Sequence, residues 1–503
     1  MNAGANGEPE KAVLPETVPP FLASRSEPLD ARQVITRFRL DIVLKYLFFR
    51  GLDGTADRAH WEFFYRKHIL DRTKGVEPQD RFQKKPSTKR SVDDYVNACE
   101  ELYRSFKSDG FDPTYPIPVS VDKRLLNGAH RTACALATDT RVIVAPAERG
   151  VRKSWGFRWF LERGYPRDVL AALLYYYAHL TSRAIGVLIL WGPTLQAWRE
   201  IMEELKNEAG VVGWLDLSFE TNPSAFESIV QDIYSLQWSR LEQSHIRRKT
   251  IFLNQARRIF RVIVLEDLFE HRLEFLKELR ALRARIRTKY NELIPEEAFC
   301  TCHASSNEGE SSYLIELLLG QGSRKHQLLR PRGQLRPEFG GWLYKLEEEL
   351  ARHGLSRQDI CIVGSSPLEV LGIRNATDID ITIASRFRKR FGAGITHLNE
   401  WLDVVRQGYA RAADRPRISD DQLIDNPEHH FWFRGYKFAD VDIVLRRKAL
   451  QGRAKDIADV ESAKEFFSPE AGKRVQADGA NRAGMELISY LVRREKENKG
   501  RRL

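Results

Sequence analysis

The chain has 503 residues, of which 42% are hydrophobic and 30% charged. These fractions are ordinary for a globular protein, and the length is sufficient for about three domains. The odd number of cysteines, five, argues against a disulfide framework and favours reduced thiols in the cytoplasm. The net charge of +11 permits a nucleic-acid partner, but basic and acidic residues are interleaved through most of the chain, so we expect bound nucleotides to be the better explanation.

Residues 1–30 form a polar, proline-rich lead that we expect to be disordered, because it lacks the apolar core of a signal peptide. The most apolar stretch comes later, in the sequence VLAALLYYYAHLTSRAIGVLILW. Its centre carries Arg183, which a membrane-spanning helix would not readily accommodate. We therefore predict a buried helix followed by a strand, and no membrane span.

Residues 31–150 are predicted to be helical at first and then to form a strand, a turn and a helix in PIPVSVDKRLLNGAHRTACALATDTRVIVA. Glycine at 128 permits a sharp turn, and a helix beginning at His130 and Arg131 presents hydrogen-bond donors to an anion. This segment resembles the Gly-x-His-Arg element of the ParB/sulfiredoxin-like fold, whose members bind or hydrolyse nucleotides and in some cases transfer phosphate. The resemblance implies that Gly128, His130 and Arg131 bind phosphates. Asn127 stands where that family more often has Asp or Glu, and a simple helix cap is the alternative.

Residues 151–325 are predicted to form a central α/β domain with the order strand, helix, strand, helix, strand, helix, strand. This order, with a His-x-Ser sequence entering the last helix, resembles the ferredoxin-like nucleoside diphosphate kinase fold. The resemblance implies that His303 accepts a phosphoryl group and that Arg287 clamps the phosphate. Two departures weigh against such activity, because the family's Lys-Pro-Asp is replaced by residues 191–193 and its Asp by Ser306.

The last region, residues 326–503, contains the most informative stretch, VGSSPLEVLGIRNATDIDIT. An apolar strand is followed by Gly364 and Ser365, which allow close approach of the backbone to a phosphate. Residues two apart on a strand point the same way, so Asp378 and Asp380 are expected to share one face. Two hard oxygen donors suit Mg²⁺ and a bound triphosphate.

This arrangement resembles the DNA-polymerase-β-like nucleotidyltransferase superfamily, in which a Gly-Ser, about a dozen residues and an Asp-x-Asp precede one more carboxylate on a neighbouring strand. The third carboxylate is expected in KFADVDIVL, read as a strand, where Asp442 is preferred over Asp440 because an apolar run follows it. The resemblance further implies that Arg453 and Lys455, on a following basic helix, contact the triphosphate or brace the site. Asp456 and Asp459 of that helix are expected to be structural.

The sequence thus predicts an α/β (α+β) multidomain enzyme with a ParB/sulfiredoxin-like domain, a ferredoxin-like domain and a nucleotidyltransferase-fold domain. Its expected activity is Mg²⁺-dependent transfer of a nucleotidyl group from a nucleoside triphosphate to a small phosphorylated acceptor, coupled to a phosphotransfer or kinase step, in capsule, lipopolysaccharide or natural-product assembly. The alternatives are a nucleic-acid-binding or tRNA-modifying nucleotidyltransferase, and a regulatory protein with degenerate nucleotide sites. The expected catalytic residues are Asp378, Asp380, Asp442 and His303, the first three also as ligands of two Mg²⁺ ions. The expected nucleotide-binding residues are Gly364, Ser365, Ser366, Arg453, Lys455, Gly128, His130, Arg131 and Arg287.

Overall fold

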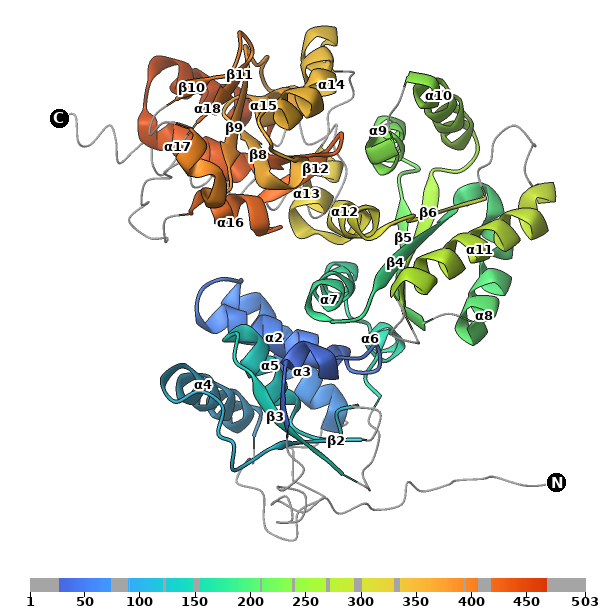
Figure 1. Cartoon of the computed structure of the whole chain (residues 1–503), viewed down its shortest axis with the longest axis vertical. Helices are drawn as coiled ribbons and strands as arrows, with labels where there is room; N and C mark the ends of the chain where they lie inside the picture. Colours follow the sequence, from blue (N-terminus) through green and yellow to red (C-terminus); the bar gives the residue numbers. More distant parts are fainter. Residues whose placement is uncertain are drawn as a thin grey trace. The chain divides into compact units, whose positions relative to one another are not determined.

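The computed structural model of the chain (Figure 1) describes residues 27–73, 89, 91–120, 124–147, 154–208, 210–237, 240–267, 272–293, 301–329, 335–391, 395–405 and 418–467. Helices and three small sheets alternate along these residues, which confirms the expected mixed α+β class. The chain forms two compact units. The first consists of Met1–Gly186, Met202–Leu215 and Ile263–Lys277, and the second of Val187–Ile201, Asp216–Val262 and Glu278–Leu503.

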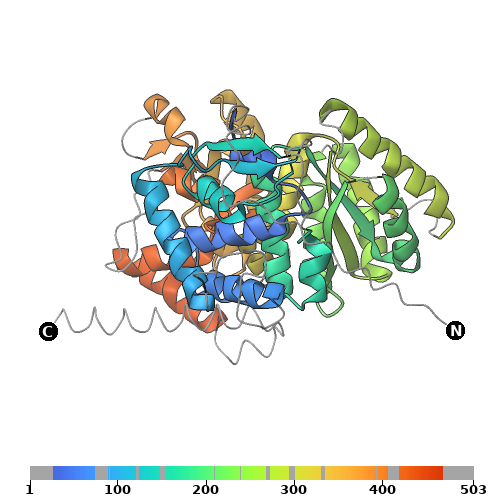
Figure 2. The same cartoon turned by 90° about the horizontal axis from the view of Figure 1, so that it is seen from below.

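The first unit contains a three-stranded sheet with the order β1-β3-β2. Its helices, coloured blue to teal in Figure 2, lie between these strands in the sequence or follow them. In the sheet β1 is antiparallel and β2 parallel to β3. Helix α2 is buried along most of its length and packs against α3, α5 and α7. The elements are β1 (Glu27–Leu29), α2 (Leu40–Leu52), α3 (Arg58–Thr73), α4 (Val92–Ser108), β2 (Ile117–Val119), α5 (Ala129–Ala137), β3 (Val142–Pro146), α6 (Phe157–Glu162) and α7 (Arg167–Leu180).

A four-stranded sheet follows along the chain, with the order β5-β6-β4-β7. Every residue of its strand β4 is buried, which explains the continuous apolar run in the sequence. The strands are β4 (Ile185–Trp191), β5 (Gly210–Ser218), β6 (Ile259–Glu266) and β7 (Cys302–Ala304). The helices are α8 (Trp198–Glu208), α9 (Pro223–Ile233), α10 (Arg240–Gln255), α11 (Arg272–Tyr290), α12 (Glu308–Leu319) and α13 (Gln321–Leu329). Helix α7 followed by strand β4 confirms the prediction for the most apolar stretch, and no helix within the described residues is both long and apolar enough to cross a bilayer.

The six-stranded sheet of the second unit has the order β10-β11-β9-β8-β13-β12. Its strands are β8 (Ile360–Val363), β9 (Ile379–Ile383), β10 (Thr396–His397), β11 (Leu402–Val404), β12 (His430–Phe433) and β13 (Tyr436–Ala439). Its helices are α14 (Pro337–Arg352), α15 (Ser366–Val370), α16 (Asp420–Asp425), α17 (Val441–Gln451) and α18 (Ala454–Phe466). Successive residues of β8 belong to two different cores. Ile360 and Ile362 pack with α14, whereas Cys361 and Val363 pack with α17 and α18.

The stretch KFADVDIVL is not the single strand that the sequence suggested, and this prediction is wrong. Strand β13 ends at Ala439, and Asp440 caps helix α17 by accepting a hydrogen bond from the Asp442 backbone N–H at 2.8 Å. The apolar residues after the cap, Val441, Val444 and Leu445, are buried at helical spacing. The expected basic helix is divided at Gly452, which has a φ of 64° and separates α17 from α18.

The stretch SRKHQLLRPRGQLRPEF, whose Arg, Gln and Pro content predicts a linker into the last domain, is partly helical. Its first seven residues belong to α13, residues 330–334 lie outside the described part of the chain, and α14 begins at Pro337. The four cysteines among the described residues, Cys99, Cys134, Cys302 and Cys361, are buried free thiols. The fifth, Cys300, lies outside the described residues.

Candidate active site

The turn after β8 is shaped by Gly364, which adopts a left-handed conformation with a φ of 67°. A Cβ atom added there would overlap the Asp380 Oδ2 atom, so only glycine fits beside this carboxylate. Ser365 follows at the N-cap of the short helix α15, and Ser366 Oγ donates a hydrogen bond to the Asp378 carbonyl oxygen at 3.2 Å. The Gly-Ser turn therefore touches both ends of the Asp-x-Asp sequence directly.

Asp378 immediately precedes strand β9, and Asp380 lies within it. Ile379 and Ile381 are fully buried, whereas both aspartates are only partly buried. This confirms the predicted alternation, with the two carboxylates on the opposite side of the strand from the isoleucines.

A third carboxylate, which the sequence analysis missed, lies beside Asp380. Asp403 on strand β11 is the register partner of Asp380 in a parallel pair of strands. Its Oδ1 atom is 2.8 Å from Nδ1 of the exposed His397. The signal in the sequence was a single Asp between apolar residues in Trp-Leu-Asp-Val-Val. Nothing local shows, however, that this short strand becomes the neighbour of β9.

The three carboxylates interact electrostatically. Burial raises the pKa of Asp380 to about 6, and the charges of Asp378 and Asp403 add to the increase. Arg447 and Lys448 on α17 act in the opposite direction and lower this pKa. The site therefore places like charges close together, with two cationic side chains of α17 nearby.

The loop before Asp378 is held by ion pairs. Glu369 on α15 accepts hydrogen bonds from Arg336 Nε at 3.0 Å and from the Ala376 backbone N–H at 2.6 Å. Arg374, in the same loop, pairs with the buried carboxylate of Asp459 on α18. These contacts fix the path of the chain between α15 and β9.

Asp456 and Asp459 are both buried, and Lys448 pairs with each of them, at 3.3 and 2.6 Å respectively. Arg453 also pairs with Asp456, while the charge of Asp380 helps to raise the pKa of Arg453. Arg453 was expected either to contact the triphosphate or to brace the site, and its ion pair with Asp456 is a contact of the second kind. Lys455 is exposed on α18.

Within the described residues, Asp442 makes no contact with Asp378 or Asp380. It lies in the first turn of α17, where it pairs with Arg446 at 2.7 Å. Burial raises the pKa of Asp442 and the charge of Asp440 adds to the increase, whereas Lys325 and Arg446 act in the opposite direction. Burial would also raise the pKa of Asp440, but Lys325 and His326 hold it well below the usual range. Asp440 and Asp442 thus belong to a cluster with Lys325.

The donor set at Asp380 fits a hard divalent cation, because it consists of carboxylate oxygens whose mutual repulsion a cation would relieve. Within the described residues, however, no three His, Cys, Asp or Glu side chains are gathered into a closed metal-ligand group, and this holds for Asp378, Asp380 and Asp403 as well as for Asp442. Like charges are expected to stay apart until a cation draws them together.

His303 is only 2% exposed, on strand β7, and its Nε2 atom is 3.1 Å from Glu310 Oε1. Burial lowers the pKa of His303, and Glu310 opposes this effect. The Arg287 guanidinium donates to the Cys302 carbonyl oxygen at 2.9 Å. Both residues thus have internal partners, and neither lines the cavity described below.

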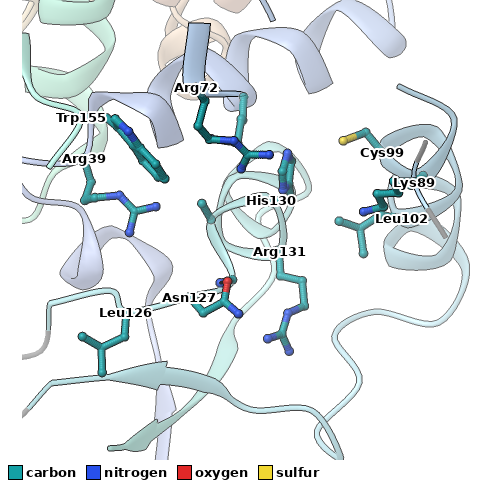
Figure 3. A pocket seen from close by; sticks show the side chains of 14 residues that line it. Arg39, Arg72, Lys89, Cys99, Leu102, Leu126, Asn127, His130, Arg131 and Trp155 are labelled. Carbon is teal, nitrogen blue, oxygen red and sulfur yellow. Dashed lines mark hydrogen bonds between the residues drawn. The ribbon is translucent and has the colours of Figure 1, made fainter. Parts of the chain in front are cut away.

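Gly128, His130 and Arg131 lie together at the start of α5, as expected, and line a cavity of the first unit (Figure 3). Gly128 has a φ of 88° and occupies the N-cap. His130 Nε2 lies 2.9 Å from the Tyr65 hydroxyl, and Arg131 Nη1 donates to the Tyr115 carbonyl oxygen. Burial lowers the pKa of His130 well below its usual range, with further contributions from Lys45, Lys89 and Arg72.

Comparison of the chain with protein-family models, with curated proteins and with solved structures gives no match.

Proposed function

We propose that the six-stranded part of the second unit is a Mg²⁺-dependent nucleotidyltransferase, which moves a nucleoside monophosphate group from a nucleoside triphosphate to a small phosphorylated acceptor. The observation that carries the proposal is the pairing of Asp380 with Asp403 on adjacent strands, with Asp378 two residues before Asp380 and Gly364 against its carboxylate. Asp403 replaces Asp442 as the third acidic residue in this proposal.

The residues have distinct tasks. Asp378, Asp380 and Asp403 would hold Mg²⁺, which when bound polarises the phosphate and supports ionisation of the attacking oxygen. Gly364 leaves room for the Asp380 carboxylate, and Ser365 and Ser366 follow it at the start of α15, where backbone N–H groups favour a phosphate. Arg447 and Lys448 supply positive charge near Asp380, where negative charge would increase during transfer. Asp456 and Asp459 keep the Lys448 side chain in place.

The acceptor is proposed as a small phosphate because several arginines near the site are already paired with carboxylates. These are Arg336, Arg374 and Arg388, which pair with Glu369, Asp459 and Asp420. His303 is left out of the proposed chemistry, because its buried imidazole is bonded to Glu310.

The test is pyrophosphate release by the full chain, measured with each nucleoside triphosphate and Mg²⁺ against sugar phosphates, polyol phosphates and RNA. Asp380→Asn should abolish release while the protein keeps its circular-dichroism spectrum. Release that needs RNA and falls steeply with salt would favour a nucleic-acid acceptor instead. Turnover by Asp380→Asn at the rate of the unaltered protein would refute the proposed site.

A further inference from the structure

The first unit contains a cavity of about 310 Å³ lined by residues of α2, α3, α4, α5 and the segment before α2 (Figure 3). Figure 3 shows Arg39, Arg72 and Lys89 reaching it from different sides, with His130 and Arg131 on the helix α5 between them. Among the described residues, five cationic side chains and no carboxylate line the cavity; the cations are Arg39, Lys45, Arg72, Lys89 and Arg131. Such a set of positive charges without carboxylates attracts an anion.

Two of these cations have a counter-ion behind the cavity wall. Asp41 accepts hydrogen bonds from Arg39 Nε at 2.8 Å and from Lys45 Nζ at 2.6 Å, and all three side chains are buried. Arg39 also donates to the Leu125 carbonyl oxygen at 3.0 Å. One carboxylate thus fixes two cations at the cavity wall and neutralises only one of them.

Arg72 is the cation that most clearly lacks a counter-ion. Within the described residues it forms no hydrogen bond or ion pair, and its guanidinium lies 5.4 Å from the centre of the Tyr95 ring. Lys89 Nζ lies 4.9 Å from the same ring. Two like charges are therefore held near each other, and both also act on His130, which burial keeps neutral.

Arg131, which the sequence suggested as the phosphate ligand, is already bonded to the Tyr115 carbonyl oxygen. Further positive charge at the cavity comes from outside the Gly-x-His-Arg element, from Arg72 on α3 and from Lys89. Arginine suits a phosphate group because its planar fork donates two parallel hydrogen bonds.

We infer that this cavity is a binding site for a compact, multiply charged organic phosphate ester, held chiefly by Arg72 with Lys89 and Arg39. Because cations line the cavity in excess, the ligand is expected to carry more than one negative charge. The volume, at the low end for small-molecule sites, sets its size, which is nearer to a sugar phosphate than to a complete nucleoside triphosphate. This inference does not depend on the proposed nucleotidyl transfer, which concerns other residues in the other unit.

The experiment is titration calorimetry of the full chain with ribose 5-phosphate, ribose and inorganic phosphate, without Mg²⁺. Ribose 5-phosphate should bind more tightly than inorganic phosphate, and ribose should not bind. Arg72→Ala should weaken ribose 5-phosphate binding at least about tenfold, the scale of one lost charge-assisted hydrogen-bond pair. Arg72→Lys, which keeps the charge but not the fork, should give an intermediate loss.

Arg104→Ala is the matched control, because Arg104 lies on α4 of the same unit with its side chain 70% exposed, and it does not line the cavity. Arg104→Ala should change the affinity for ribose 5-phosphate by no more than about twofold, and the same is expected of Asp380→Asn in the other unit. Equal losses in Arg72→Ala and Arg104→Ala would overturn the inference, as would equal affinities for ribose 5-phosphate and inorganic phosphate. Loss of binding in Asp380→Asn would move the site to the second unit.

Discussion

Asp380 is the residue whose surroundings say most about the candidate active site. It is partly buried, it lies between Asp378 and Asp403, and its pKa is raised from 3.8 to about 6. A carboxyl group with a raised pKa in the folded state binds protons more tightly there than in the unfolded state. Its contribution to folding stability is therefore lost as the pH rises from about 4 to about 6.

This argument makes Asp380→Asn a stabilising change at neutral pH in the absence of metal. The variant should unfold at a higher temperature at about pH 7.5, with a gain of about 1 to 2 kcal/mol, and the gain should disappear below about pH 4. Thermal unfolding followed by circular dichroism at both pH values measures it. A lower unfolding temperature at neutral pH would show that Arg447 and Lys448 stabilise the Asp380 carboxylate more than Asp378 and Asp403 destabilise it.

Asp403 and Asp442 are expected to differ in their effect on catalysis. Asp403→Asn should slow nucleotidyl transfer at least about a hundredfold, because Asp403 is the strand partner of Asp380. Asp442→Asn should cost much less, since the Asp442 carboxylate is engaged with Arg446 in the first turn of α17. Rates of pyrophosphate release at saturating Mg²⁺ distinguish them. The opposite order would return the third acidic position to Asp442.

Gly364 and Gly452 form a matched pair, because both have a positive φ, of 67° and 64°. A Cβ atom at Gly452 meets nothing within 4 Å, whereas one at Gly364 overlaps Asp380. Gly452→Ala should therefore cost only the conformational strain, about 1 kcal/mol, and leave the activity unchanged. Gly364→Ala should cost more stability and abolish nucleotidyl transfer. Unfolding in urea and rate measurements on both variants test this, and equal rates would remove Gly364 from the site.

At the scale of elements, the sequence was reliable where the signal was local. The alternation of Asp378, Ile379, Asp380 and Ile381 placed β9 correctly, and the apolar runs placed β4, β6 and β8. The stretch after β13 misled because Ala439, Val441 and Ile443 alternate with Asp440 and Asp442 as in a strand, while Val441, Val444 and Leu445 also fit one face of a helix. The capping bond of Asp440 decides between them, and it is visible only in the folded chain.

The third acidic residue could not be found for a different reason. Strand β11 has three residues, too few for a periodic pattern, and its importance comes from its pairing with β9. Such pairing joins segments that are distant in sequence, so it is set by the whole sheet and not by local propensity. The cavity of the first unit was missed likewise, because Arg39, Arg72 and Lys89 come from separate segments.

The contact between α13 and the start of α17 is expected to be important for stability. Lys325 Nζ lies 3.0 Å from Asp440 Oδ1, and Asp440 is only 4% exposed. Lys325→Ala would leave a buried carboxylate with a weaker set of partners and should destabilise the protein by about 3 kcal/mol. The loss should shrink as the pH falls, because the low pKa that Lys325 maintains for Asp440 would rise and allow protonation.

Lys206→Ala is the control for this prediction, since its ion pair with Glu203 is exposed and worth little. Urea unfolding of each variant at neutral pH and at about pH 4 measures the loss in the free energy of unfolding. A loss no larger than that of Lys206→Ala would mean that Asp440 finds enough stabilisation from His326 and from its capping bond.

At the scale of the whole molecule, the two cores of the six-stranded sheet are formed by residues between 339 and 463. Helix α13 nevertheless supports this sheet, since Ser323 Oγ accepts a hydrogen bond from the Trp432 backbone N–H at 3.1 Å and Gly322 lies against the His430 carbonyl oxygen. The expected domain boundary at residue 326 lies inside this helix.

A fragment of residues 307–467 should therefore be more stable than a fragment of residues 336–467, although the two share every strand of the sheet. The shorter fragment loses Lys325, Ser323 and the packing of α12 and α13 on β12. Thermal unfolding of the two purified fragments measures the difference. Identical unfolding temperatures would show that α12 and α13 contribute nothing to this sheet.

The buried cysteines can report local unfolding of the protein. Cys99 and Cys134 belong to the first unit and Cys302 and Cys361 to the second, and burial raises the pKa of all four thiols. A thiol reagent attacks an exposed thiolate, so each of these side chains reacts only when its own region opens. In a protein carrying Cys300→Ser, the modification rate at each cysteine, followed by mass spectrometry, would thus time the opening of each unit separately, with no foreign label introduced.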